Sequence, residues 1–292
     1  TETNITRSSG SSSADWRLDP ITTGIGCVQG DTIQEVGGDI LFLAPDGIRF
    51  LGATDRIGDF SLALASRQIQ EDFQDYVSPG SKYCSLLVRE KNQYRLMKYV
   101  STTSKQNTIG YIGTQFLDQN AQSLAWSSTK GIKAYRASSA YSNDTEVSVF
   151  TNGDEYVYRL ESGSDFDGLA ITSAYSTPFM AVNDPSVRKT AYKVKTYFDP
   201  EGVVTGTLNL RYDFNVPSKI QPKSLAVSGG GSFTFYGGAI YGASTYGGVP
   251  DTVFETQVVG SFFTASLQYV FEGGAPFTLD TITLEYSTED KK

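Results

Sequence analysis

The chain has 292 residues, of which 39% are hydrophobic and 19% charged, a composition typical of globular rather than disordered proteins. The formal net charge of −8 argues against an outer surface that binds nucleic acid, since such surfaces rely on clustered Lys and Arg. The absence of histidine excludes Ser-His-Asp and Cys-His nucleophile systems and zinc sites that use histidine ligands.

The first residues of the chain are small and polar. Residues 1–13 include Ser-Ser-Gly-Ser-Ser-Ser, and we expect residues 1–15 to form a flexible arm, because such a sequence offers little to pack. From Trp16 onwards the pattern is that of β-strands, which predicts a first domain over residues 16–175. Cys27 and Cys84 lie in this domain, and we expect reduced, buried thiols because a disulfide scaffold would hold more cysteines.

Short hairpins dominate this first domain. At residues 36–51 two apolar runs flank Ala-Pro-Asp-Gly, in which Asp-Gly favours the positive φ of a tight turn. Residues 150–160 repeat this pattern around Asn-Gly-Asp. Repeated hairpins of this kind predict partial β-propeller-like blades or a similar all-β shell. The candidate strands are 32–36, 39–43, 47–51, 82–90, 93–100, 109–117, 121–127, 131–138, 145–150 and 155–160.

Residues 64–77 break the strand pattern. Their apolar residues are spaced by three and four, which predicts one short amphipathic helix that ends at Ser-Pro-Gly. We expect this helix to plug or flank a sheet, and the alternative is a helix that binds a partner. The apolar positions are Ala65, Ile69, Phe73, Tyr76 and Val77.

A domain boundary is predicted where residues 169–175 end as a strand and two proline breaks follow, at Pro178 and Pro185. Beyond the breaks, the runs 189–198, 203–214, 261–271 and 277–286 alternate between apolar and polar residues, which predicts a C-terminal β-sandwich or open barrel over residues 187–292. The alternation places Tyr192, Val194, Thr196 and Phe198 on one face of their strand, and Leu208, Leu210, Tyr212 and Phe214 on one face of the next.

Residues 229–248, which lie between the second and third of these runs, are rich in glycine and aromatic residues. This composition suits a long loop that becomes ordered against a neighbouring molecule, and the alternative is a free surface loop. The possible contact residues are Phe233, Phe235, Tyr236, Tyr241 and Tyr246.

Three pairs of acidic residues are candidates for catalytic carboxylates, since two such groups suffice for glycoside hydrolysis. Each pair lies at or beside a predicted turn, where Asp is favoured for backbone reasons. Residues 165–168 could also present oxygens to calcium, but the remaining ligands of such a loop are missing. We therefore expect no catalytic residue, no metal and no cofactor. The pairs are Glu35 with Asp39, Asp154 with Glu155, and Asp165 with Asp167.

Several stretches, taken in order, resemble the tail tubular or nozzle (tail hub) proteins of short-tailed bacteriophages. Val36-Gly37-Gly38-Asp39, Phe42-Leu43 and Asp46-Gly47-Ile48-Arg49 resemble one of their propeller blades, and Asp199-Pro200-Glu201-Gly202 and Leu210-Arg211-Tyr212-Asp213 resemble the sheet that follows. The resemblance covers most of residues 25–215. Further stretches between these also resemble the family's sequences, in the same order. They are Ala125-Trp126-Ser127, Gly131-Ile132, residues 153–160, Phe166-Asp167-Gly168, residues 175–179 and Arg188-Lys189.

This resemblance implies a structural virion protein of the phage tail, assembled in the host cytoplasm and not an enzyme. It implies a homo-oligomer, a hexamer around a channel, that contacts other tail proteins and holds and conducts the genome. An acidic channel wall would let DNA pass without specific binding. No run of 18 apolar residues is present, so we expect no stable membrane insertion.

Two other functions remain open from the sequence. One is a host-receptor or glycan-binding module that uses the aromatic loop at 233–248, which Tyr236→Ala or Tyr241→Ala would inactivate. The other is a carboxylate-based polysaccharide hydrolase, whose activity Asp167→Asn and Glu35→Gln would eliminate. The chain begins without methionine, so we expect a processed product or a part of a longer polypeptide.

Overall fold

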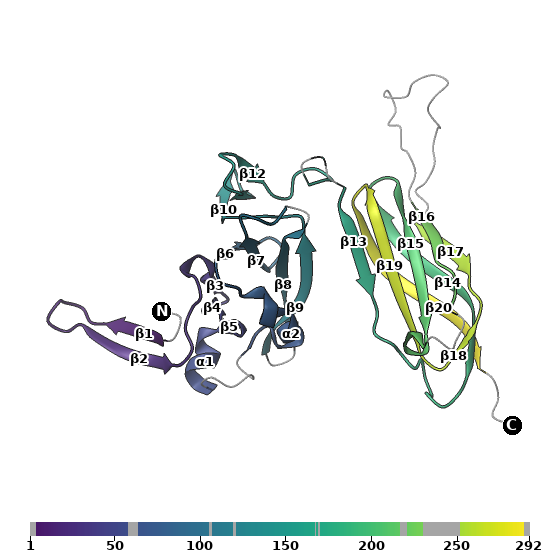
Figure 1. The fold of residues 1–292 in the computed structure, drawn as a ribbon, viewed down its shortest axis with the longest axis horizontal. Helices are drawn as coiled ribbons and strands as arrows, with labels where there is room; N and C mark the ends of the chain where they lie inside the picture. Colours follow the sequence, from purple (N-terminus) through teal and green to yellow (C-terminus); the bar gives the residue numbers. More distant parts are fainter. Residues whose placement is uncertain are drawn as a thin grey trace, which may run out of the picture. The chain divides into compact units, whose positions relative to one another are not determined.

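The computed structural model describes residues 4–57, 64–104, 107–118, 121–166, 168, 170–216, 221–229 and 252–288. It is mostly antiparallel β-sheet, with 56% strand and 10% helix, which confirms the predicted all-β class. The chain divides into two compact units, Thr1–Ser162 and Gly163–Lys292 (Figure 1). Among the described residues the sheets stay open, and none of the helices has the length and apolar character to span a membrane.

The first unit begins with a hairpin where the sequence predicts a flexible arm. Strand β1 (Asn4–Ser9) pairs antiparallel with β2 (Arg17–Thr23), and the Ser-rich stretch forms the connection between them. The prediction fails because backbone hydrogen bonds hold this ribbon together, and these need no apolar period in the sequence. Gly10, at φ +137°, lets the chain leave β1 close to Trp16.

Three antiparallel meanders make up most of the first unit. The predicted Ala-Pro-Asp-Gly turn joins the second and third strands, where Ala44 pairs with Gly47. Gly37 and Gly38 both have positive φ and form the tight turn between the first two strands, in the gap between the predicted strands 32–36 and 39–43. Nine of the ten strands lie close to their predicted ranges, and the strand expected at 131–138 lies further along the chain. The meanders are β3 (Gln34–Val36), β4 (Asp39–Ala44) and β5 (Gly47–Phe50); β6 (Lys82–Val88), β7 (Gln93–Tyr99), β8 (Ile109–Asp118) and β9 (Ala121–Lys130); and β10 (Arg136–Ser142), β11 (Thr145–Thr151) and β12 (Val157–Arg159).

The predicted helix is present in a shorter form. A 3-10 turn at Arg67–Ile69 leads into α2 (Gln70–Tyr76), which buries Phe73 and Tyr76 against the meanders. A second helix, α1 (Leu51–Ile57), was not predicted. It follows β5 directly, and Asp39 Oδ1 accepts a hydrogen bond of 2.9 Å from the Gly52 amide, so its start depends on a residue distant in sequence.

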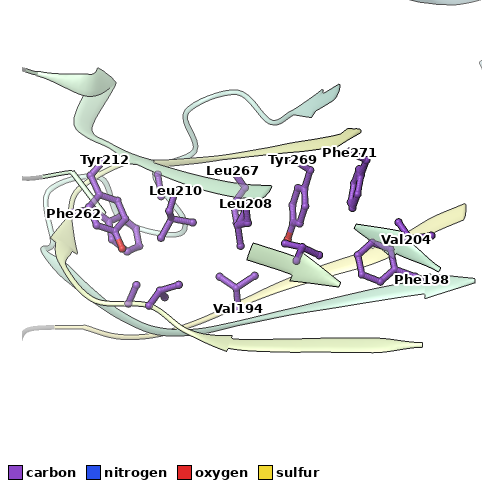
Figure 2. Packing of buried hydrophobic residues seen from close by; sticks show 14 residues of the cluster. Val194, Phe198, Val204, Leu208, Leu210, Tyr212, Phe262, Leu267, Tyr269 and Phe271 are labelled. Carbon is purple, nitrogen blue, oxygen red and sulfur yellow. The ribbon is translucent and has the colours of Figure 1, made fainter. Parts of the chain in front are cut away.

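The second unit is a β-sandwich, as predicted. One sheet has the strand order β13 (Thr172–Ser176), β19 (Ala265–Gly274), β15 (Val204–Tyr212) and β16 (Leu225–Gly229). In the other, β14 (Lys189–Pro200) pairs with β17 (Val253–Gln257), β18 (Ser261–Phe262) and β20 (Phe277–Thr288). Figure 2 shows the apolar side chains of both sheets meeting in a single core, which includes Val194, Leu208, Tyr269 and Phe271.

The boundary of this unit differs from the predicted one. Strand β13 was placed in the first domain, but Thr172 pairs with Glu272 and Ser176 with Gln268, so it is an edge of the sandwich. A strand's distant partner leaves no mark in its own sequence, and the proline breaks at 178 and 185 fall inside the unit.

Two predicted face assignments are wrong. Val194, Thr196 and Phe198 are buried as predicted, but Tyr192 is exposed, because a register shift between Ala191 and Lys193 makes it an extra residue in β14. Phe214 is exposed because the chain leaves β15 in three consecutive residues of positive φ, Asp213–Asn215. A second shift in the same strand pair makes Asp280 the extra residue in β20.

Candidate functional site

The aromatic loop predicted as a contact region lies outside the described residues. This applies to all five of its named side chains, Phe233, Phe235, Tyr236, Tyr241 and Tyr246. Its role as a contact loop stays a prediction.

Three acids of the predicted pairs accept hydrogen bonds from neighbouring groups. Asp39 Oδ1 accepts from the amides of Ile40 and Gly52, and Asp165 Oδ1 accepts from the amide of Gly168 at 2.9 Å. The Tyr158 hydroxyl donates to Asp154 at 2.5 Å and lowers the pKa of that carboxyl.

The remaining acids come no closer to a catalytic arrangement. Glu35 is exposed and lines a hollow of about 490 Å³ that holds Arg89 but no second carboxylate. Glu155 is exposed, at a positive φ, and Asp167 lies outside the described residues. Over the described residues, no three His, Cys, Asp or Glu side chains converge as a metal site would require. The calcium interpretation of residues 165–168 gains no support.

The cysteines are free thiols, as expected. Cys84 is buried, and burial raises its thiol pKa to about 12, whereas Cys27 is only half-buried. A thiol that ionises so late is a poor nucleophile at neutral pH, so Cys84 is a core residue.

The described surface of the second unit carries a groove with a volume of about 790 Å³. Here the sandwich is open between β13, which ends one sheet, and β20, which ends the other, and β19 forms the floor. We call this hollow the edge groove. Its lining residues are Ser173, Ala174, Tyr175, Thr177, Met180, Val182, Ala265, Leu267, Phe271, Phe277, Leu279, Asp280, Thr281, Ile282 and Leu284.

The strands on both sides of the edge groove have an edge without a strand partner in the part of the chain that the structure describes. Among the described residues β20 pairs only with β14, and β13 pairs only with β19, so each strand has one unpaired edge. Such an edge presents a row of amide N–H and C=O groups that can pair with another strand. The groove therefore combines apolar side chains with unfilled backbone hydrogen-bonding positions.

Charge separates the edge groove from the outer face of the same sheet. On that face Lys195 forms ion pairs with Glu285 at 2.8 Å and with Glu255 at 3.6 Å. The hydrogen bond and charge of Glu285 raise the pKa of Lys195. In the groove Asp280 is the one charged lining residue, and it has no ion pair within the described part of the chain. The ion pairs make the outer face of the sheet polar, whereas the lining of the groove is mainly apolar and suits an apolar contact.

A second exposed apolar surface lies on the hairpin of β1 and β2, residues 4–23, which we call the N-terminal arm. Trp16 is 69% exposed and Leu18 73%, the highest values for large apolar side chains of the first unit apart from Tyr156. Only the root of the arm joins a core, where Ile5 packs with Ile25 and Phe42. In Figure 1 the arm extends away from the meanders of its own unit.

Sequence reasoning found neither surface. The groove residues of β20 alternate as core residues do, and nothing in the run 277–286 shows that the next strand is missing. The sole sequence signal for the arm was Trp16, an isolated large side chain after a polar stretch.

Comparisons with known proteins gave no match, neither to a protein-family model nor to a curated protein.

Proposed function

We propose that the chain is a structural subunit of the tail of a short-tailed bacteriophage, part of a tube or nozzle that holds and conducts the genome. The observation that carries the proposal is the position of the residues that resemble this family. Gly37-Gly38 form the turn between β3 and β4, and Asp46 follows β4 in the next turn. The resemblance thus falls on successive hairpins and not on scattered residues.

The ion pair of the second turn adds a structural reason for that motif. Arg49 is fully buried, and its Nη2 donates to Asp46 Oδ2 at 2.6 Å. A buried guanidinium needs a partner of this kind, because an unpaired charge in the core is costly. Asp46 and Arg49, two residues on which the resemblance rests, therefore form one structural unit.

The surface supports an assembled role. The edge groove and the N-terminal arm expose apolar area that monomeric proteins usually cover. The net charge of −8 suits a channel wall from which DNA is repelled, so that it slides without binding. On the resemblance we propose six copies around the channel, in contact with other tail proteins, in a virion assembled in the host cytoplasm.

Two measurements test this function. Light scattering coupled to chromatography, with electron microscopy of the same fraction, is expected to show a closed ring of the purified chain. Mass spectrometry of purified virions is expected to detect the chain. A monodisperse monomer that is also absent from virions would contradict the proposal.

A further test concerns DNA. We expect no salt-dependent binding of duplex DNA in a fluorescence anisotropy titration, because counterion release requires clustered cations. Tight, sequence-independent binding that weakens steeply with salt would contradict a non-binding channel wall.

A further inference from the structure

We propose that the edge groove receives the N-terminal arm of a second copy of the chain, so that copies join head to tail. This inference rests on the proposed assembly and names its contact, but the joint could exist in a protein that is not part of a phage tail.

The N-terminal arm is a two-stranded hairpin, and among the described residues no third strand pairs with it. An isolated two-stranded ribbon is marginally stable in water, and further strands or a packed face must stabilise it. Trp16 and Leu18 are two residues apart, so they lie on one face of the extended chain, and both are mostly exposed. A partner surface that covers this face would complete the arm.

Among the described residues, no strand fills the edge groove between β13 and β20. Its apolar lining belongs to the core of the sandwich, and Leu267 and Phe271 on its floor are buried while Ile282 and Leu284 on its wall are half-buried. An added strand would pair with a free edge through its backbone and insert alternate side chains between the sheets. The geometry thus calls for an extended segment with an apolar residue at every second position.

The sequence Trp16-Arg17-Leu18 meets this requirement. The apolar pair would enter the groove, while the arginine would stay at its rim. The acids of the arm already have partners in the arm, since Ser12 Oγ donates to Asp15 at 3.1 Å and Ser9 Oγ donates to Asp19 at 3.4 Å.

Charge and size favour the same pairing. Arg7 and Arg17 have no ion pair among the described residues, and the rim of the groove carries the unpaired carboxylate of Asp280. The arm spans residues 4–23, and a standard interface uses about 20–30 residues from each partner. The face of the arm that carries Trp16 and Leu18 can therefore supply part of such an interface.

The two surfaces differ, so the contact is heterologous. Identical contacts of this kind close into a ring or continue as a filament, according to the rotation between copies. A ring is the form that the proposed tail function needs.

Cross-linking between two single-cysteine variants tests the joint. In a background of Cys27→Ala and Cys84→Ala, one chain carries Leu18→Cys and the other Ser173→Cys, which lines the groove. The matched control replaces Ser173→Cys by Thr172→Cys, the neighbouring exposed residue of β13 that is not in the lining. We expect a disulfide-linked dimer between the Leu18→Cys and Ser173→Cys chains. We expect no such dimer between the Leu18→Cys and Thr172→Cys chains.

Self-association without cysteines provides the second readout. Trp16→Ala with Leu18→Ala should weaken it by about thirtyfold or more, as for a central aromatic anchor, in sedimentation velocity across a concentration series. Both side chains are exposed, so folding should not change. The control is Tyr156→Ala, which removes an aromatic ring that is also 69% exposed but lies outside the arm.

Three results would overturn the joint. They are equal cross-linking at residues 172 and 173, unchanged association of the Trp16/Leu18 variant, and a cross-link within one chain when Leu18→Cys and Ser173→Cys are combined. A ring that persists in the Trp16/Leu18 variant would refute the joint and leave the tail function standing. If copies associate through this joint but the chain is absent from virions, the joint would stand and the tail function would be refuted.

Discussion

The two units reach an all-β fold by different routes. In the first, each strand pairs with its neighbour in sequence, and the core is divided among separate clusters around Phe73, Cys84 and Phe42. In the second, β13 pairs with β19 and β14 with β20, around one continuous cluster. Local pairing spreads stability over small pieces, whereas distant pairing concentrates it in one core whose strands must all meet before it forms.

The largest expected effect is a truncation in the single core of the second unit. Phe262 is fully buried and stacks on Tyr212 with 5.1 Å between ring centres, so Phe262→Ala should cost about 3–5 kcal/mol of that unit's free energy of unfolding. Urea titrations followed by far-UV circular dichroism measure it. The control is Phe263→Ala, since that neighbouring ring is 37% exposed and should cost far less.

The same variant tests whether the cores are separate. Both tryptophans, Trp16 and Trp126, lie in the first unit, so tryptophan fluorescence reports on that unit alone at protein concentrations too low for copies to associate. We expect its urea midpoint to stay unchanged in Phe262→Ala. An equal shift of both transitions would show that the two cores unfold as one.

A smaller loss is expected at the buried cation of the second unit. Lys189 is fully buried, and its Nζ donates to the carbonyls of Asp184 at 2.6 Å and Val187 at 3.0 Å. Lys189→Met removes the donor to the Val187 carbonyl and one of two donors to the Asp184 carbonyl, which also accepts from the Val187 amide at 3.3 Å. This should cost about 2–3 kcal/mol in the same urea titration. Lys193→Met is the control, because its ion pair with Glu255 is exposed to solvent and contributes little to stability. Equal losses would contradict the role of burial.

A turn substitution measures what a local element contributes to the first unit. Gly38 has φ +82°, and a Cβ there would meet no atom within 4 Å, so Gly38→Ala adds backbone strain without a clash. We expect a loss of about 1–2 kcal/mol in the fluorescence-detected unfolding. Gly30→Ala is the control, since that glycine has equally open space and no positive φ. A similar loss at both positions would rule out strain as the cause.

The smallest effect concerns pH. Burial acts to raise the pKa of Glu161, but hydrogen bonds from Lys91 and Arg95 outweigh it and hold the pKa below the ordinary 4.5. The ion pairs therefore stabilise the first unit above that pH, and their contribution is lost as the pH falls through the lower folded pKa.

Because these side chains are partly exposed, the contribution is only about 0–1 kcal/mol. Glu161→Gln should flatten the acid side of the fluorescence-detected stability profile by this amount. Glu35→Gln, at an exposed carboxylate without an ion pair among the described residues, should leave the profile unchanged. An unchanged profile in Glu161→Gln would mean that the ion pairs contribute nothing.

The contrast between the units also explains what the sequence could predict. The Gly37-Gly38 turn and the strand at 93–100 depend on neighbours in sequence, and both were predicted closely. Strand β13, the start of α1 at Gly52 and the reversal at Tyr192 depend on distant partners, and each was missed or misplaced. The edge groove was invisible for the same reason, because an open edge is a property of the assembled sheet.

The extra residue at Asp280 has a consequence for solubility. Without it, the remaining eleven residues of β20 would alternate regularly between apolar and polar side chains along an edge that no strand pairs with among the described residues. Flat edges of this kind template the stacking of identical chains into cross-β fibrils. As a β-bulge, Asp280 twists the strand, and its carboxylate adds a negative charge at the edge. Both effects restrict which segments can pair with β20. Deletion of Asp280 should therefore allow many different segments to pair there.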